Sequence, residues 1–333
     1  MPQLPYITLD VFTTTPLTSG NPLAVVTIPA SVSITKSQEH LIAREFGYSE
    51  TIFIYPDSVL PEEKRGEYTK IAIWTTLQEL PFAGHPTVGA GWVLGASKRE
   101  GEILVPAGRV GYVYDEGRVR IDTPHDIKLW ERTVSRQRIG EVIGLPYEFF
   151  NPDQVFDNST ILLANVSGRG WGDEDIPMVS IVDGMSFALV QVSSVGVLQA
   201  LKAGRKGVGL DVVADLGATA VPGGKTFIGV YCYTILSEAT DGGKGRVEVR
   251  SRMFFDGDGE DPATGSAACA LGSYLGIVKD DGVIKEWEFE ITQGVEVGRR
   301  SDIGVRVLLE GGKVEKVYLE GEAVKVMEGV LTV

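Results

Sequence analysis

GHPTVGAGWVLG at residues 84–95 and GSAACALGSYLG at residues 265–276 are two stretches dominated by glycine and other small residues. Both read as helices, although each glycine lowers helix stability by about 1 kcal/mol relative to alanine. Such a helix persists where tertiary packing brings other backbone very close on all sides. We therefore predict two helices, each buried inside its own part of the chain.

The two stretches are related to each other as an internal repeat. With an offset of 181 residues they match at Gly84 and Gly265, Gly91 and Gly272, Leu94 and Leu275, and Gly95 and Gly276. A repeat at a fixed offset indicates two copies of one structural unit. We predict an α/β (α+β) fold of two similar halves, related by an approximate two-fold axis. Each half is a strongly curved, mostly antiparallel sheet rolled around one buried helix.

Most of the remaining chain reads as short strands. Residues 6–12 alternate between apolar and polar side chains, and residues 23–28 form a continuous apolar run. Both patterns are typical of strands. We also predict two hairpins, one across Asp115-Glu116-Gly117 and one across Gly311-Gly312.

Helices outside the repeat are few. The clearest spans residues 35–46, where Thr35 and Gln38 form a capping box and Gly47 supplies the C-terminal stop. Two further helices and one elaborated loop are expected at residues 135–144, 196–202 and 147–177.

The length of the chain indicates two domains. Its 333 residues exceed the roughly 250 at which a single hydrophobic core stops growing. We place residues 1–128 in the N-terminal half and residues 129–321 in the C-terminal half. A strand at about residues 322–333 is expected to complete the N-terminal half.

The formal net charge of −14 argues against nucleic acids and anionic membranes as partners, because binding to polyphosphates depends on clustered Lys and Arg. The N-terminal sequence MPQLPYITLDVF lacks a basic start followed by an apolar run, and no uncharged stretch approaches about 18 residues. We therefore expect a cytosolic protein. Two cysteines and three scattered histidines lack the spacing of a metal site, so we expect no metal.

Residues 79–86 and 259–266, here called the lead-in segments, each run into the N-terminus of a glycine-rich helix. Free backbone N–H groups and the positive end of the helix dipole make such a terminus an anion site. Two of them facing each other would hold a carboxylate between the halves. The alternative is that the glycines serve helix packing alone. Neither segment has a phosphate-binding motif, so a small organic acid is favoured over a nucleotide.

Three side chains near these segments are candidates for chemistry. Glu50 lies between the Gly47 stop and an apolar strand, where a surface glutamate is the ordinary interpretation. His85 is a general acid, a hydrogen-bond donor to substrate, or a helix residue satisfied by a neighbour. Asp261 caps its helix from outside or titrates in the site.

Several motifs follow one another in a specific order. They are Asp10-Val11-Phe12, Asn21-Pro22-Leu23-Ala24-Val25, Ile42-Ala43-Arg44-Glu45, Ser49-Glu50-Thr51, residues 79–86, residues 260–267, Gln293-Gly294 and Gly298-Arg299-Arg300-Ser301. With this order and spacing the chain resembles the PhzF-like phenazine-biosynthesis family over essentially its whole length. The resemblance implies the diaminopimelate epimerase-like fold, with two pseudo-symmetric halves, and a homodimer.

The resemblance also implies roles for individual residues. In that family the glutamate of the Ser-Glu-Thr motif is the acid/base on a carbon-bound hydrogen, which implies this role for Glu50. His85 and Asp261 are implied to line the same site and assist it. The substrate-binding residues that we expect are Asn21, Ser49, Gly84, Gly265 and Ser266.

A racemase mechanism with two cysteines does not fit the sequence. Diaminopimelate epimerase and proline racemase use two opposed thiols at the heads of the buried helices, where this chain has Gly84 and Gly265. Cys269 lies a turn further into its helix, and Cys232 lies in a predicted strand. Without these thiols the nucleophilic and basic groups of that route are missing.

A single carboxyl group can still take a proton from an activated carbon and return it elsewhere on a conjugated system, with no metal or organic cofactor. Founding members of the family isomerise a dihydro-hydroxyanthranilate in this way. We therefore expect a cofactor-independent isomerase of a small, cyclic or unsaturated carboxylic acid. Trp74-Thr75-Thr76 replaces the more common Phe-Thr-Pro, which leaves the substrate open. The alternatives are a non-catalytic carboxylate-binding protein and a scaffold protein.

Overall fold

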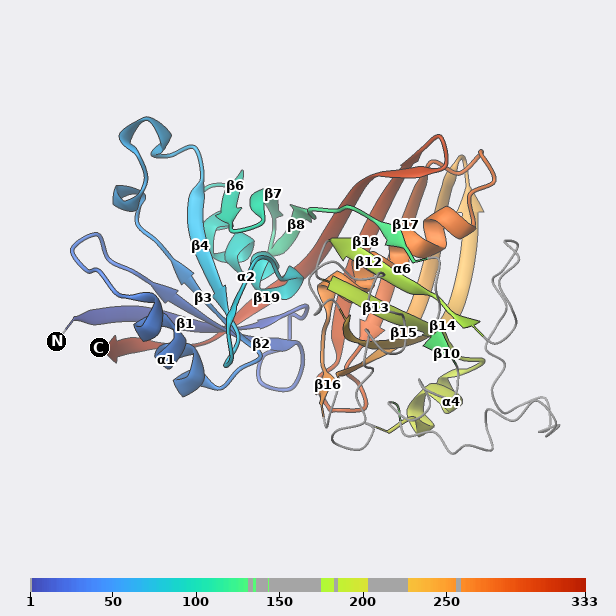
Figure 1. Cartoon of the computed structure of the whole chain (residues 1–333), viewed down its shortest axis with the longest axis horizontal. Helices are drawn as coiled ribbons and strands as arrows, with labels where there is room; N and C mark the ends of the chain where they lie inside the picture. Colours follow the sequence, from blue (N-terminus) through green and yellow to red (C-terminus); the bar gives the residue numbers. More distant parts are fainter. Residues whose placement is uncertain are drawn as a thin grey trace. The chain divides into compact units, whose positions relative to one another are not determined.

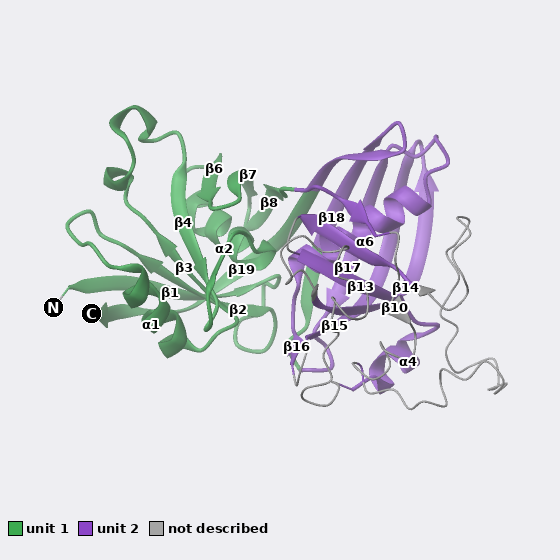
Figure 2. Ribbon diagram, viewed as in Figure 1, with its two compact units in different colours: residues 1–124, 298–303, 318–333 green, residues 125–297, 304–317 purple. Residues whose placement is uncertain are grey.

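The computed structural model describes residues 2–130, 134–135, 143, 175–182, 185–202, 227–255 and 259–333 (Figure 1). These residues form two compact units (Figure 2). Unit 1 comprises Met1–Pro124, Gly298–Ile303 and Tyr318–Val333, and unit 2 comprises His125–Val297 and Gly304–Val317. The division into folding halves at residue 128 stays a prediction.

Unit 1 is a sheet that closes on itself. Its strands are β1 (Gln3–Val11), β2 (Asn21–Thr27), β3 (Glu50–Ile54), β4 (Thr69–Trp74), β5 (Glu79–Leu80), β6 (Glu100–Val105), β7 (Gly108–Asp115), β8 (Arg118–Asp122) and the end of β19 (Lys313–Thr332). Strand β19 pairs antiparallel with β8 through its Tyr318 to Glu322 stretch and with β1 through its Ala323 to Thr332 stretch. This double pairing removes both sheet edges and makes a barrel.

Unit 2 contains a second curved sheet. Its strands are β9 (Lys128–Leu129), β12 (Met178–Val182), β13 (Met185–Gln191), β14 (Phe227–Asp241), β15 (Lys244–Phe255), β16 (Glu260–Asp261), β17 (Glu286–Gln293) and most of β18 (Ser301–Glu310). A separate two-stranded sheet pairs β10 (Val134–Ser135) with β11 (Asp175–Ile176).

The order of strand pairings repeats between the units. In unit 1 the pairs β1–β2, β2–β3, β3–β4 and β4–β6 are antiparallel, parallel, antiparallel and parallel. In unit 2 the pairs β12–β13, β13–β14, β14–β15 and β15–β17 follow the same order. The short strands β5 and β16 each pair with the fourth strand, directly before the buried helix. The predicted fold class is thereby confirmed.

The two glycine-rich helices lie inside these sheets. Helix α2 (Gly84–Gly95) packs against β1, β2, β3, β6, β7 and β8, and helix α6 (Gly265–Val278) packs against β12, β13 and β17. A Cβ atom at Gly91 would lie 2.7 Å from Val119, and one at Gly272 would lie 2.9 Å from Val305. These distances are shorter than van der Waals contact, so the matched glycines allow the close approach that the sequence predicted.

Helices α1 and α4 and both hairpin turns agree with the sequence predictions, and two other predicted segments lie largely outside the described residues. Helix α1 (Lys36–Phe46) has the expected capping box between Thr35 and Gln38 and ends at left-handed Gly47. Helix α4 (Val195–Ala200) lies close to the range predicted for it, and both hairpin turns have positive φ at two successive residues. Of the predicted helix 135–144 the structure describes only Ser135, in β10, and Ile143; of the predicted loop 147–177 it describes only residues 175–177, of which Asp175 and Ile176 form β11. Two short 3-10 helices span Asp57–Val59 and Glu62–Lys64.

The helices have no membrane-spanning character in the described ranges: none of them combines enough length with enough apolar sequence to cross a bilayer.

Candidate active site

Glu50 is the first residue of β3, where the chain returns to the sheet after α1. The left-handed conformation of Gly47, with φ of 66°, ends α1 as its N–H bonds to the Ala43 carbonyl. Three residues later β3 begins, with Glu50 beside Leu23 in the parallel ladder to β2. The Glu50 side chain retains 17% exposure. Its position at the start of a strand therefore directs the carboxyl group into a largely buried site. The interpretation of Glu50 as an ordinary surface glutamate is wrong.

The imidazole of His85 lies next to this carboxyl. His85 is the second residue of α2 and is 4% exposed, and its Nδ1 lies 3.3 Å from Glu50 Oε2. Among the described residues, Oε2 accepts no hydrogen bond with good geometry and is shielded from solvent. Hydrogen bonds from the protein therefore replace only part of the hydration that the Glu50 carboxylate loses on burial.

Burial is the main cause of the unusual acidity of Glu50. Loss of water raises the pKa of this carboxyl from 4.5 to about 6, and a hydrogen bond from Ser49 opposes the rise. A carboxyl group with a pKa this close to neutrality exchanges protons in both directions at physiological pH. The site thus contains one group that can act as an acid and as a base.

Ser49 directly precedes Glu50 and contacts Asn21; that Asn21 and Ser49 bind substrate stays a prediction. Asn21 is the first residue of β2 and is 2% exposed, and its Oδ1 accepts a hydrogen bond of 3.4 Å from Ser49 Oγ. A serine hydroxyl has one proton to donate, so Asn21 and Glu50 compete for it.

The N-terminus of α2 also belongs to this group. Its N-cap residue is Ala83, and no described side chain caps the helix there. Thr87 bonds back to the Ala83 carbonyl through both its N–H and its hydroxyl, while Gly84 and His85 present the first N–H groups of the helix. These groups and the helix dipole favour a negative charge at this end.

In unit 2, Asp261 lies in β16 and is 7% exposed. Its Oδ2 accepts a hydrogen bond of 2.6 Å from the Thr264 hydroxyl, and Thr264 is the N-cap of α6 without a side-chain cap of its own. Asp261 thus holds the N-cap residue of α6. Gly265 and Ser266 are the first two residues of α6, and Ser266 is 5% exposed.

Gln293 holds the same segment and was not recognised from the sequence as more than part of a motif. It is fully buried, and its amide nitrogen donates to the Asp261 carbonyl at 2.8 Å and to Thr264 Oγ1 at 3.1 Å. Its amide oxygen accepts from the Thr264 N–H at 3.2 Å and from the Tyr231 hydroxyl at 3.1 Å. These bonds fix the backbone that leads into α6.

Two glutamates at equivalent repeat positions, Glu79 and Glu260, were also missed. Each lies in the short strand before its buried helix, with the same offset of 181 residues. Glu79 pairs with Lys36 on α1 at 2.7 Å. Glu260 accepts two bonds of 2.9 and 2.6 Å from Arg252, whose guanidinium also binds carbonyls at the end of α4. Applying the repeat offset to the lead-in segments would have found this pair.

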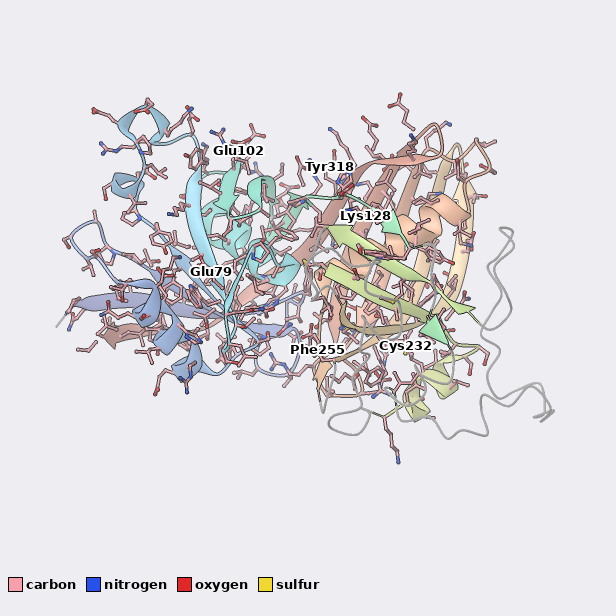
Figure 3. All side chains as sticks on the ribbon, in the orientation of Figure 1. Glu79, Glu102, Lys128, Cys232, Phe255 and Tyr318 are labelled. Carbon is pink, nitrogen blue, oxygen red and sulfur yellow. The ribbon has the colours of Figure 1, made fainter. Side chains whose placement is uncertain are left out.

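The two cysteines lie away from the first residues of both buried helices. Cys232 lies on β14 (Figure 3), and Cys269 is the fifth residue of α6; both are buried. Burial raises the pKa of the Cys232 thiol well above its usual range. The helix heads carry Gly84 and Gly265, so the thiol pair of a two-cysteine racemase is missing from these positions.

The predicted site residues therefore fall into two groups. Asn21, Ser49, Glu50, Gly84 and His85 come together in unit 1, and Asp261, Gly265 and Ser266 lie together at the start of α6 in unit 2. That both groups bind one ligand stays a prediction.

Comparison with known proteins identifies the family. The family model described as "Phenazine biosynthesis-like protein" (PhzC-PhzF) matches residues 9–329. An uncharacterized isomerase of Mesorhizobium japonicum is 32% identical, with 98% of both chains covered. A trans-2,3-dihydro-3-hydroxyanthranilate isomerase of Pseudomonas aeruginosa is 29% identical, covering 97% of this chain and 98% of that protein.

Solved structures agree on the fold. A PhzF-family protein of Bacillus anthracis matches with a TM-score of 0.70 at 21% identity, covering 100% of both chains. A hydroxyproline epimerase of Agrobacterium vitis matches with a TM-score of 0.52 at 12% identity, covering 99% of this chain and 91% of that one. The chain therefore belongs to the phenazine biosynthesis-like (PhzC-PhzF) family, has the diaminopimelate epimerase-like fold, and is an isomerase.

Proposed function

We propose that Glu50 moves a carbon-bound proton within a small, cyclic or unsaturated carboxylic acid, in a cofactor-independent isomerisation. The observation that carries this proposal is the largely buried Glu50 carboxyl, 3.3 Å from His85 and with its pKa raised to about 6. A group with this acidity can remove a proton and give it back in one catalytic cycle.

The proposed reaction balances without an oxidant or reductant. Ionised Glu50 takes a proton from a carbon next to a double bond, and the electron pair of the broken C–H bond moves into the conjugated system. Protonated Glu50 then returns the proton to a different carbon, which restores the carboxylate. His85, next to Glu50, is proposed to donate a hydrogen bond to the substrate or to Glu50 during this exchange.

The substrate carboxylate is proposed to bind at helix N-termini. The first turn of α2, at Gly84 and His85, directs backbone N–H groups and the positive end of the helix dipole toward a bound anion. The N-terminus of α6 at Gly265 and Ser266, with Asp261 assisting, is proposed to serve the same ligand. The relatives named as trans-2,3-dihydro-3-hydroxyanthranilate isomerases make this compound one candidate among several, because 29% identity does not transfer a substrate. A homodimer and a cytosolic location stay predictions.

Turnover by variants of Glu50 tests the proposal. The protein is incubated with trans-2,3-dihydro-3-hydroxyanthranilate and a panel of unsaturated carboxylic acids, and isomers are identified by NMR. Glu50→Gln should bind the substrate, seen as line broadening, and lose turnover by a factor of about 10³ or more. Glu45→Gln, on the exposed side of α1, is the matched control and should keep full turnover. Equal turnover in both variants would refute the role of Glu50; binding without turnover in the unmodified protein would favour a carboxylate-binding protein.

A further inference from the structure

Residues 13–20, here called the 13–20 loop, connect β1 to β2 together with Phe12 and are held in an unusual conformation directly before Asn21. Phe12 and Leu17 have φ of 66° and 72°, and residues with a Cβ atom rarely adopt such values. Gly20 has φ of 76°. A Cβ at Gly20 would lie 2.5 Å from Thr13 Cγ2. Such backbone persists only where the surrounding structure fixes it.

Arg299 makes several of the hydrogen bonds that hold the loop in this conformation. Its Nε donates to the Gly20 carbonyl at 3.0 Å and its Nη1 donates to the Leu17 carbonyl at 2.6 Å, while its Nη2 pairs with Asp10. The second oxygen of Asp10 accepts the Leu17 N–H at 2.7 Å. One planar guanidinium thus joins two carbonyls of the loop to a carboxylate that is itself bonded to the loop.

The backbone on either side of Arg299 holds both ends of the same loop. The Arg300 carbonyl accepts the Gly20 N–H at 2.8 Å, and the Asp302 N–H donates to the Phe12 carbonyl at 2.9 Å. All these residues belong to unit 1. The 13–20 loop is therefore fastened by a segment about 280 positions away in the sequence, and the two bonds of Gly20 lie directly before Asn21.

Asn21 connects the loop to the proposed acid/base. It follows Gly20, is almost fully buried, and accepts the hydrogen bond from Ser49, the neighbour of Glu50. The described polar groups facing Glu50 are His85 on α2 and Ser49 in its own segment, while β2 presents apolar Leu23 opposite it. Release of Asn21 would let water reach Glu50 and would free the single Ser49 proton for it.

We propose that Arg299 is a positioning residue for Glu50. By fastening the 13–20 loop, Arg299 holds Asn21 against Ser49 and excludes water from the Glu50 carboxyl. Its importance for catalysis rests on the proposed function of Glu50, but its effect on the Glu50 environment does not. Both consequences of loosening the loop, hydration and a freed Ser49 proton, lower the pKa of Glu50.

A titration of the Glu50 carboxyl carbon by ¹³C NMR tests this without any substrate. Protein labelled at glutamate side-chain carboxyls is titrated, and the Glu50 signal is assigned by its loss in Glu50→Gln. The unmodified protein should titrate at about 6. In Arg299→Gln the midpoint should fall by about half a pKa unit or more. Arg300→Gln is the matched control, because that neighbouring side chain is 62% exposed and pairs only with Asp302 among the described residues.

Two further variants keep the test decisive if Arg299→Gln does not fold. Arg299→Lys keeps the charge next to Asp10, but one ammonium cannot span both loop carbonyls, so it should show a smaller fall in the same direction. Asp10→Asn should also lower the midpoint. An Arg299→Lys protein that titrates like the Arg300→Gln control would overturn the proposal. Failure of the unmodified protein to isomerise any compound would refute the proposed function while leaving this titration result intact.

Discussion

The buried Glu50 carboxyl lowers the stability of the folded protein at neutral pH, and the same burial gives this group a pKa suited to proton transfer. Its folded-state pKa, about 6, lies above the ordinary 4.5, so the folded protein binds this proton more tightly than the unfolded chain does. The stability contributed by the protonated form is fully present below pH 4.5 and is lost as the pH rises through 6. At neutral pH the ionised group costs about 2 kcal/mol of the free energy of unfolding.

Replacing this carboxyl by an amide should therefore stabilise the protein in a pH-dependent way. We expect Glu50→Gln to raise the free energy of unfolding by up to about 2 kcal/mol at pH 7.5, with the gain vanishing below pH 4.5. Chemical denaturation at several pH values measures this. The exposed Glu45→Gln variant should change stability by less than about 0.5 kcal/mol. A gain for Glu50→Gln that does not depend on pH would contradict the burial account.

Sequence patterns predicted some residues of the site and not others. Glu50 and His85 were predicted because short motifs resembled those of a family, while the local pattern alone suggested a surface glutamate. The pairs Lys36–Glu79 and Arg299–Asp10 could not be found locally, because their members lie 43 and 289 positions apart. Side chains so far apart meet only through the tertiary fold, which no local pattern specifies.

At the scale of single elements, the two buried helices differ in how tightly they are enclosed. At the equivalent positions Gly95 and Gly276, a Cβ would lie 2.3 Å from Tyr114 Cβ in the first case and 3.6 Å from the Trp287 ring in the second. The first distance is a clash with an atom next to the backbone. The second is an ordinary contact. The repeat in sequence therefore predicted both helices, but not which glycines are required.

This difference predicts opposite effects of the same substitution. Gly95→Ala should lower the free energy of unfolding by about 1 to 3 kcal/mol, because Tyr114 cannot move away. Gly276→Ala should raise it by about 0.5 to 1 kcal/mol, because alanine favours the helix and finds room. Thermal or denaturant unfolding of the two variants decides this. If both substitutions stabilise, the close packing of α2 is wrong.

The lead-in strand β16 depends on the buried pair of Arg252 and Glu260, whose side chains are 6% and 7% exposed. Removing the Glu260 charge leaves Arg252 with only the more distant Glu296 carboxylate at 3.9 Å, so Glu260→Gln should cost about 3 kcal/mol. The exposed pair of Arg246 and Glu288 is the control, and Glu288→Gln should cost less than about 1 kcal/mol. Similar losses in urea unfolding for both would show that the Glu260 pair is not buried in solution.

At the scale of the whole chain, the sequence predicted the two-fold repetition but not the discontinuous units. The offset of 181 residues is visible in the helices, and the same order of pairings recurs in the strands. The return of residues 298–303 to unit 1 was missed, because a segment of six residues has no local signal for its partner. Only the C-terminal strand was expected to return, at about residues 322–333.

Strand β19 closes the barrel of unit 1, so its loss should affect the whole unit. Removing residues 323–333 leaves β1 without its partner over the Ala323 to Thr332 stretch and opens a sheet edge. We expect this truncated chain to aggregate or to lose cooperative unfolding. A chain shortened only by Val333 should unfold like the full-length protein. Cooperative unfolding of the longer truncation, followed by circular dichroism, would contradict the closed barrel.

Proton transfer by Glu50 can be tested by hydrogen exchange in D₂O, because a carbon-bound proton that the Glu50 carboxyl removes is replaced by deuterium from the solvent. Substrate found in the screen is incubated in D₂O with the unmodified protein, Glu50→Gln or Glu45→Gln, and deuterium at each carbon is followed by NMR. The account predicts deuterium at the reacting carbons with the unmodified protein and Glu45→Gln, and none with Glu50→Gln. Deuterium incorporation at an undiminished rate in Glu50→Gln would show that another group moves the proton.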